Sequence, residues 1–332
     1  MEGSLKISRR SFLAASALLP AQSALAAQAV ETGWPSALLM ATGRPGGVYD
    51  IYGAAWGKIA QASSGVAVAY RATGGSAADI LLIEQGAAQL GMTTVTVANQ
   101  ARTGTGHWTA GVKFSNFRAL FPIFPSILQI VTLASSGITS LAGLGNRVIG
   151  VGPDGGSGSA AVPDILASIG VIPSDMPTAD YGAQLRDMLA GRIDACAFIG
   201  APPLPAITAV AETKQLGVIG FTPAEAKQVA RATPGMTAMT LPPGTFPRQS
   251  MAIASVGTAN FAIGAANLPD ALVRAITLAT MHNQANLEKV VPAAGLFTQS
   301  AGVLPGDMTF HPGAASALRS LGIEIPAALV VR

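Results

Sequence analysis

The sequence ATGGS at residues 72–76 lies between an apolar run typical of a strand, residues 66–70, and a run typical of a helix, residues 77–85. Two similar loops occur in the chain: ATGRPGG at residues 41–47 and GGSGS at residues 155–159. Glycines let backbone N–H groups turn inward, and the start of a helix adds unpaired donors and positive dipole character. We therefore expect the three loops to form the walls of one anion-binding site.

Strand and helix signals alternate on both sides of these loops, which favours the α/β class, a parallel sheet covered by helices. Residues 37–41 and 90–95 are predicted strands, and residues 66–71 predict a strand buried on both faces. Pro202 and Pro203 predict the start of a helix in the second half of the chain. Both halves of the chain thus show the same alternation of strands and helices.

Two crossings between the halves are also predicted. Pro122 and Pro125 disfavour a helix over residues 120–133 and indicate an extended segment that leaves the first lobe. Residues 251–256 predict a strand that returns to it. We expect two lobes joined by a two-segment hinge, with a ligand cleft between them. The predicted lobes are residues 33–128 with 252–332, and residues 129–251.

The length of 332 residues exceeds one ordinary core, which agrees with two domains. Half of the residues are hydrophobic, 11% are charged and the mean hydropathy is +0.45. A spanning helix needs about 20 mostly apolar residues, whereas the best later run, residues 120–134, is short and interrupted by prolines. We expect a mature protein that does not span a membrane.

The amino terminus has the three parts of an export signal. SRRSFL at residues 8–13 matches the twin-arginine pattern, residues 12–19 form a short apolar core, and residues 24–26 offer a small-x-small cleavage site. We predict a signal peptide over residues 1–26 that is cleaved near Ala26, and therefore a periplasmic protein.

Chemistry-bearing residues are few and scattered. Without Lys6, Arg9, Arg10 and Glu2, the mature chain has 17 positive and 16 negative residues, so no nucleic-acid partner is expected. The three histidines lack neighbours at metal-ligand spacing, and Cys196 falls in an apolar strand, which predicts a buried thiol. We expect no catalytic residues, no metal and no cofactor.

The pattern G-x-G-x-x-G occurs at residues 150–155, after a predicted strand. A dinucleotide site begins its helix within this motif and has an acidic residue about 20 positions later, at the end of the next strand. Here the helical pattern begins only around residues 157–160, and Asp175 and Asp180 fall in loops. We therefore interpret the motif as a turn.

The loops and several later motifs resemble those of the TAXI family, the extracytoplasmic solute-binding subunits of one class of TRAP transporter. The similar motifs lie at residues 41–49, 71–76, 90–94, 141–158, 189–195 and 311–314, and the resemblance covers residues 37–322. The chain departs from the family at Arg44, Pro45 and Asp50, where glycines and a second tyrosine are usual, and at Thr94, where the family often has glutamine.

This resemblance implies a type II periplasmic binding-protein fold that closes on a small organic anion, namely a dicarboxylate, a 2-oxoacid or an acidic amino acid. The implied partner is a TRAP membrane permease. Alternatives are the binding subunit of an ATP-driven importer, a periplasmic sensor and an exported enzyme. The predicted ligand contacts are Thr42, Gly47, Tyr49, Thr73, Gly74, Gly75, Ser76, Thr94, Gly156, Ser157 and Ser159, with Arg44 and Arg71 as candidate charge partners.

Overall fold

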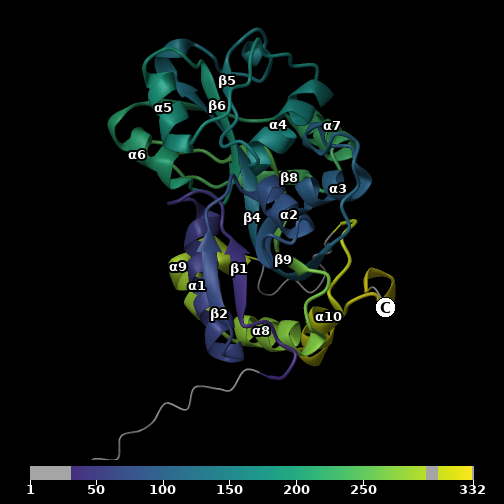
Figure 1. Ribbon diagram of the computed structural model, residues 1–332. Coiled ribbons are helices and arrows are strands. Elements are labelled where there is room, and N and C mark those ends of the chain that lie inside the picture. The colour runs from purple at the N-terminus through teal and green to yellow at the C-terminus, as the bar shows by residue number, and fades with distance from the viewer. Residues whose placement is uncertain (1–30, 297–305, 331–332) are drawn as a thin grey trace, which may run out of the picture.

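The computed structural model describes residues 31–296 and 306–330, which form two α/β lobes (Figure 1). The predicted signal peptide and its cleavage site lie outside the described residues. Within the described ranges, no helix is long and apolar enough to cross a membrane.

One nine-stranded sheet runs through both lobes in the order β2-β1-β3-β9-β4-β6-β5, with β7 paired to β4 and β8 to β9. The strands are β1 (Ala37–Ala41), β2 (Ala67–Arg71), β3 (Leu90–Thr94), β4 (Phe117–Leu133), β5 (Ile149–Gly150), β6 (Ala195–Gly200), β7 (Leu216–Ile219), β8 (Thr237–Leu241) and β9 (Ile253–Ala265).

Helices connect the strands and cover the sheet. The α-helices are α1 (Val48–Ser64), α2 (Ser76–Glu84), α3 (Val95–Thr103), α4 (Ser157–Ser168), α5 (Tyr181–Leu189), α6 (Pro205–Thr213), α7 (Pro223–Ala232), α8 (Asp270–His282), α9 (Gln284–Val290) and α10 (Pro312–Ser320). Short 3₁₀ turns lie at His107–Thr109, Ala134–Ser136, Ala142–Leu144, Pro292–Leu296 and Ala327–Leu329.

The predicted crossings are the long antiparallel strands β4 and β9. Pro122 pairs with Phe261 and Pro125 with Ala259, and the register of β4 shifts around both prolines. Such irregularities accommodate residues that cannot donate a ladder hydrogen bond. The prediction of an extended segment over residues 120–133 is therefore confirmed, and β4 passes from one lobe into the other.

Strand β6 shows how the second lobe is layered. Ala195, Ala197 and Ile199 pack into one hydrophobic cluster, together with α4 and α7. Cys196 and Phe198 pack into another, with α5 and α6. Because side chains alternate across a strand, these clusters lie on opposite faces of the sheet, and Figure 1 shows the two helix pairs on either side.

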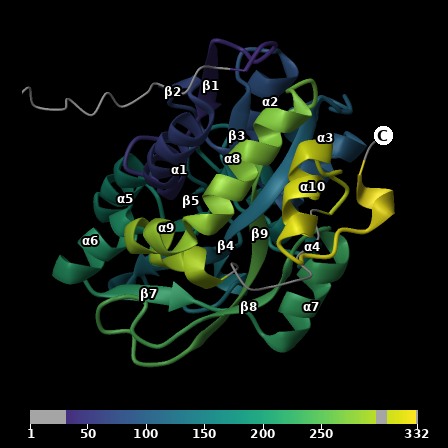
Figure 2. The ribbon, with the colours of Figure 1, turned by 90° about the horizontal axis from the view of Figure 1, so that it is seen from below.

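The first lobe has one large core in which α1 packs against α8, as Figure 2 shows from below. Tyr52 and Trp56, one turn apart on α1, are fully buried. Their rings meet Phe124 and Phe121 edge-on, with centroids 5.5 and 5.4 Å apart. The buried face of α1 thus packs against β4.

Two local predictions are wrong. Strand β2 is not buried on both faces: it lies at the edge of the sheet, with β1 as its only neighbour among the described residues, and Tyr70 is 45% exposed. Helix α6 begins at Pro205 rather than at Pro202, because residues 201–203 form a bend before it. Apolar composition indicated a strand in the first case but could not reveal its number of neighbours.

Candidate functional site

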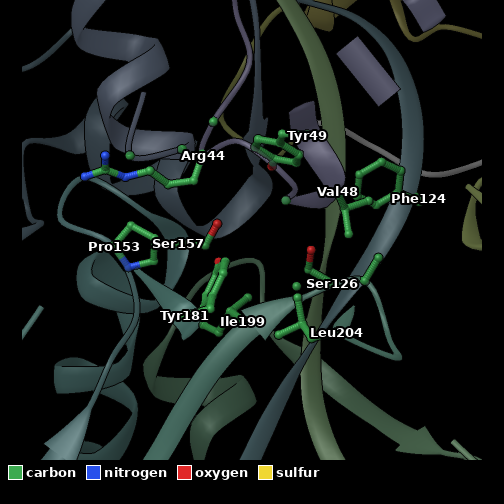
Figure 3. A pocket seen from close by; sticks show the side chains of 16 residues that line it. Arg44, Val48, Tyr49, Phe124, Ser126, Pro153, Ser157, Tyr181, Ile199 and Leu204 are labelled. Carbon is green, nitrogen blue, oxygen red and sulfur yellow. The ribbon is translucent and has the colours of Figure 1, made fainter. Parts of the chain in front are cut away.

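The three glycine loops meet around one cavity of about 50 Å³ between the lobes (Figure 3). Residues from both lobes and from the hinge strand β4 enclose it. They are Gly43, Arg44, Gly47, Val48, Tyr49, Gly74, Gly75, Phe124, Ser126, Pro153, Ser157, Tyr181, Ile199, Gly200, Ala201 and Leu204. The cavity brings together the predicted site residues Arg44, Gly47, Tyr49, Gly74, Gly75 and Ser157.

Helices from both lobes begin at this cavity. The N-cap of α1 is Gly47 and that of α4 is Gly156, and neither glycine has a side chain that could accept a hydrogen bond from the first turn of its helix. The side chains at the two helix starts accept from preceding or N-cap N–H groups instead, Asp50 from Gly46 and Ser159 from Gly156. The first N–H groups of a helix have no partner inside it and carry partial positive charge. The two helix starts therefore favour a negatively charged or strongly polar ligand group.

At the start of α2, in contrast, two backbone N–H groups already have hydrogen-bond partners in the second lobe. The N–H groups of Ala77 and Ala78 both donate to the carbonyl of Gly155 at 3.0 Å, across the cleft. Gly74 also lies so close to Asp154 that an added Cβ would be 1.6 Å from its carbonyl oxygen. Because these N–H groups bond to the second lobe, the loop at residues 72–76 and the helix start after it join the two lobes. The loop also lines the cavity.

A chain of hydroxyl groups links the lobes behind the cavity wall. Tyr49 Oη donates its single proton to Asn260 Oδ1 at 2.5 Å, so it accepts from Ser76 Oγ at 3.1 Å. Ser76 in turn accepts from Ser157 Oγ of the second lobe at 2.8 Å. Asn260 Nδ2 donates to Ser126 Oγ at 2.9 Å. The proton of Ser126 Oγ remains available to a ligand in the cavity.

Burial makes the two tyrosines that line the cavity harder to ionise than a free phenol. It raises the pKa of Tyr49 far above the ordinary value of a phenol and raises that of Tyr181 to about 12. Tyr181 lines the cavity and stacks edge-on against Phe198 at 4.8 Å. At neutral pH its hydroxyl is therefore a donor, which suits an anionic ligand group.

Thr73 holds two of the glycine loops together from behind. Its Oγ1 accepts from the N–H groups of Gly43, at 3.0 Å, and Gly75, at 3.1 Å. The hydroxyl proton goes to Asp79 Oδ1 at 2.5 Å, and Asp79 Oδ2 accepts from the Met92 N–H at 3.1 Å. Burial outweighs these hydrogen bonds and raises the pKa of Asp79 to about 7.

The remaining predicted site residues do not line the cavity. Thr42 bonds to the Arg71 carbonyl, and Arg71 itself is exposed at the end of β2. Thr94 caps α3 by accepting from the Val97 N–H. Ser159 Oγ donates to the Pro153 carbonyl and receives the Gly156 N–H. Six of the predicted site residues support the lining residues from behind but do not line the cavity themselves. They are Thr42, Thr73, Ser76, Thr94, Gly156 and Ser159.

Arg44 lines the cavity but faces a partner in the second lobe. Its Nε lies 3.0 Å from Asp180 Oδ1, and both side chains are partly exposed, at 44% and 62%. The arginine that sets this chain apart from the TAXI pattern therefore connects the lobes at the edge of the cavity.

Sequence reasoning missed Phe124, Ser126 and Tyr181. The first two belong to the crossing segment, which was interpreted only as a connection, and Tyr181 opens α5, far along the chain from the glycine loops. The one available signal was position, since hinge strands border the cleft that they connect. Within the described residues, no three His, Cys, Asp or Glu side chains are grouped to hold a metal ion.

Two α/β lobes joined by long crossing strands, with a cavity between them, define the type II periplasmic binding-protein fold, which is the fold of extracytoplasmic solute-binding proteins. The chain belongs to the NMT1-like family, whose model matches residues 40–322. A solved structure described as a periplasmic transporter is 13% identical, with a TM-score of 0.50, and the match covers 77% of this chain and 86% of that chain. This similarity supports the fold.

Two further solved structures are ligand complexes. The substrate-binding protein AbpA of an amino acid ABC transporter from Streptococcus pneumoniae, bound to L-arginine, is 13% identical with a TM-score of 0.45, covering 79% of this chain and 96% of that one. The GluR0 ligand-binding core from Nostoc punctiforme, bound to L-glutamate, is 17% identical with a TM-score of 0.48, covering 77% and 98%. None of these matches identifies the TAXI subfamily, which stays a prediction.

Proposed function

We propose that this protein is an extracytoplasmic solute-binding protein that closes its two lobes around a small organic acid. One observation carries the proposal: α1 of the first lobe and α4 of the second begin at the same cavity, and their N-caps are glycines, which have no side chain to accept from the first-turn N–H groups. A carboxylate placed there receives unpaired N–H groups from both lobes. Its binding would therefore stabilise the closed arrangement.

Binding without chemistry fits the composition of the wall. The lining offers hydroxyls, backbone groups, apolar side chains and one arginine, but no carboxylate, imidazole or thiol that would serve as a general base or nucleophile. Cys196 is fully buried inside the second lobe. An exported enzyme is thus less well supported than a binding protein.

The proposal includes the predicted lobe boundaries, residues 33–128 with 252–332 and residues 129–251. The hydrophobic clusters support boundaries close to these, because the core of the first lobe takes β4 side chains up to Phe124, and those of the second lobe begin at Ile127 and Leu128. On β9 the change falls between Val256 and Phe261, a few residues later than the predicted boundary.

We propose periplasmic delivery of the ligand to a membrane transporter. An ATP-driven importer comes first in this proposal, ahead of the TRAP permease of the sequence resemblance, because neither the family description nor the fold supports a TRAP subunit in particular. A neighbouring gene for an ATP-binding transporter subunit would support the importer. A neighbouring TRAP permease gene would instead support delivery to a TRAP transporter, as the sequence resemblance implies. A gene for a sensor kinase instead would favour a sensing role.

A thermal-shift screen of the chain from residue 27 onward, against organic acids and amino acids, tests the binding function. A ligand at 100 times its Kd adds about 2.7 kcal/mol to the free energy of unfolding, which gives a measurable rise in Tm. Small-angle scattering with the same ligand is expected to show a smaller radius of gyration. If no small anion raises the Tm, the proposed function is wrong.

A further inference from the structure

The closed cavity is small. Its volume is about 50 Å³, and one water-sized group takes roughly 10–15 Å³ of such volume. The space therefore holds about three to five groups of that size. Covalently bonded atoms lie only about 1.5 Å apart, much closer than separate waters, so the same space takes a carboxylate with a short carbon chain but not with a long one.

Direct contacts between the lobes fix this size. Ser76 Oγ lies 2.8 Å from Ser157 Oγ, and the carbonyl of Gly155 receives the N–H groups of Ala77 and Ala78. Gly74 packs against the backbone of Asp154 with no room for a side chain. A larger ligand would separate these atoms and lose the hydrogen bonds, so full closure favours a small one.

The wall has no uncompensated charge for a second ionic group. Arg44 is the sole charged residue among those that line the cavity, and Asp180 of the second lobe faces its guanidinium at 3.0 Å. The nearby carboxyl of Asp79 lies behind the wall, fully buried, with both oxygens accepting hydrogen bonds. Neither an ammonium group nor a second carboxylate would find an ionic partner in the cavity.

Polar groups and apolar side chains both face the cavity. Figure 3 shows Ser157 and Tyr181 toward one side and Val48 and Phe124 toward the other, with Ile199 beside Tyr181 and Ser126 between the two groups. A ligand with one charged end and an uncharged, largely apolar chain matches this lining. The carboxylate would meet the helix starts and the hydroxyls of Tyr181 and Ser126, whose protons are free to be donated, and the chain would meet the apolar side chains.

We propose that the cavity selects a short monocarboxylate of about three or four carbons that carries neither an amino group nor a second carboxylate. This inference rests on the proposed function and narrows it. It excludes the dicarboxylates and acidic amino acids that the sequence resemblance implies, and retains the shortest 2-oxoacids.

Matched pairs of acids test the inference by calorimetric titration of the chain from residue 27 onward. Butyrate and 2-aminobutyrate differ by one ammonium group, and butyrate and succinate differ by a second carboxylate. We expect butyrate or 2-oxobutyrate to bind at least about tenfold more tightly than both counterparts, because a buried charge without a partner is costly. If 2-aminobutyrate or succinate binds as tightly as butyrate, the inference is wrong and the proposed function stands. If no acid binds, both are wrong.

The Asp180→Asn variant tests the charge balance at Arg44. Removing the carboxylate frees the guanidinium, so the affinity for succinate is expected to rise relative to that for butyrate. The matched control is Asp187→Asn, which removes a different Asp–Arg pair, with Arg192, from a residue outside the cavity lining. A succinate-to-butyrate ratio that is the same in both variants would overturn the inference that Asp180 keeps a second carboxylate out.

Discussion

At the scale of single residues, the buried carboxyl of Asp79 makes the stability depend on pH. Burial raises its pKa from the ordinary value of 3.8 to about 7, so the folded state holds this proton more tightly than the unfolded chain. The stabilising contribution is complete below the unfolded pKa and is lost as the pH rises through the folded pKa. We expect the free energy of unfolding of the wild type, relative to Asp79→Asn, to fall between about pH 4 and pH 7.

Urea unfolding of both proteins at several pH values measures this difference. Comparison with the variant removes the contribution of His311, which has the opposite sign: burial lowers the pKa of its imidazole, so protonation below the ordinary histidine range destabilises the fold. A wild-type-minus-variant difference that stays constant across the window would show that Asp79 titrates normally.

Ser76 and Ser157 form a side-chain hydroxyl pair that joins the lobes at the cavity wall. Replacing both by alanine removes their mutual hydrogen bond, the bond between Ser76 and Tyr49, and the acceptor of the Thr94 N–H. At about 1 kcal/mol for each lost bond, ligand affinity is expected to fall by about tenfold or more while the circular dichroism spectrum stays native. Ser63→Ala is the control, since that hydroxyl bonds only within its own helix, to Ala60. Unchanged affinity in the double variant would make the serines purely structural.

At the scale of elements, α10 depends on His311. The side chain is fully buried, Nδ1 accepts from the Gly313 N–H at 3.3 Å, and Nε2–H donates to the Leu268 carbonyl at 3.1 Å. His311→Ala removes a helix cap and leaves a cavity, so we expect a loss of about 2 kcal/mol or more in urea unfolding at pH 7.5.

His282→Ala is the matched control for this helix cap. His282 is exposed in the last turn of α8, so its removal is expected to change the free energy of unfolding by less than about 0.5 kcal/mol. Equal effects of the two substitutions would contradict the capping role of His311.

At the scale of the whole molecule, Gly74 controls how closely the lobes approach. A Cβ at this position would lie 1.6 Å from the carbonyl oxygen of Asp154 in the other lobe. Gly74→Ala should leave the first lobe intact and prevent full closure. We expect ligand affinity to fall by about tenfold or more, and the radius of gyration to stay at its ligand-free value when ligand is added.

Gly182→Ala provides the control for the closure experiment. Gly182 lies within α5, and an added Cβ would come no closer than 3.5 Å to the Arg186 side chain, so the helix accepts alanine. Compaction by ligand in Gly74→Ala, equal to that in Gly182→Ala, would show that closure does not require this contact.

Much of the architecture was predictable because its signals are local. The loop at residues 72–76 stands between strand and helix as expected, Pro122 and Pro125 mark the extended crossing, and Thr222 with Glu225 forms the capping box of α7. Each signal depends on the backbone conformation of a few consecutive residues, and the types of those residues largely determine that conformation. The glycine loops thus predicted the position of the cavity between the lobes.

Only the tertiary structure decided what the site presents. It placed Ser76 behind the wall, brought Ser126 and Tyr181 to the cavity, put β2 at an edge, and paired Arg44 with Asp180, 136 positions later in the chain. These features depend on which distant segments become neighbours and on how closely two lobes meet. By itself, the sequence determined two α/β lobes with glycine-rich loops at one cleft. The size and charge of the cavity followed from contacts across that cleft, because neither quantity belongs to any single segment.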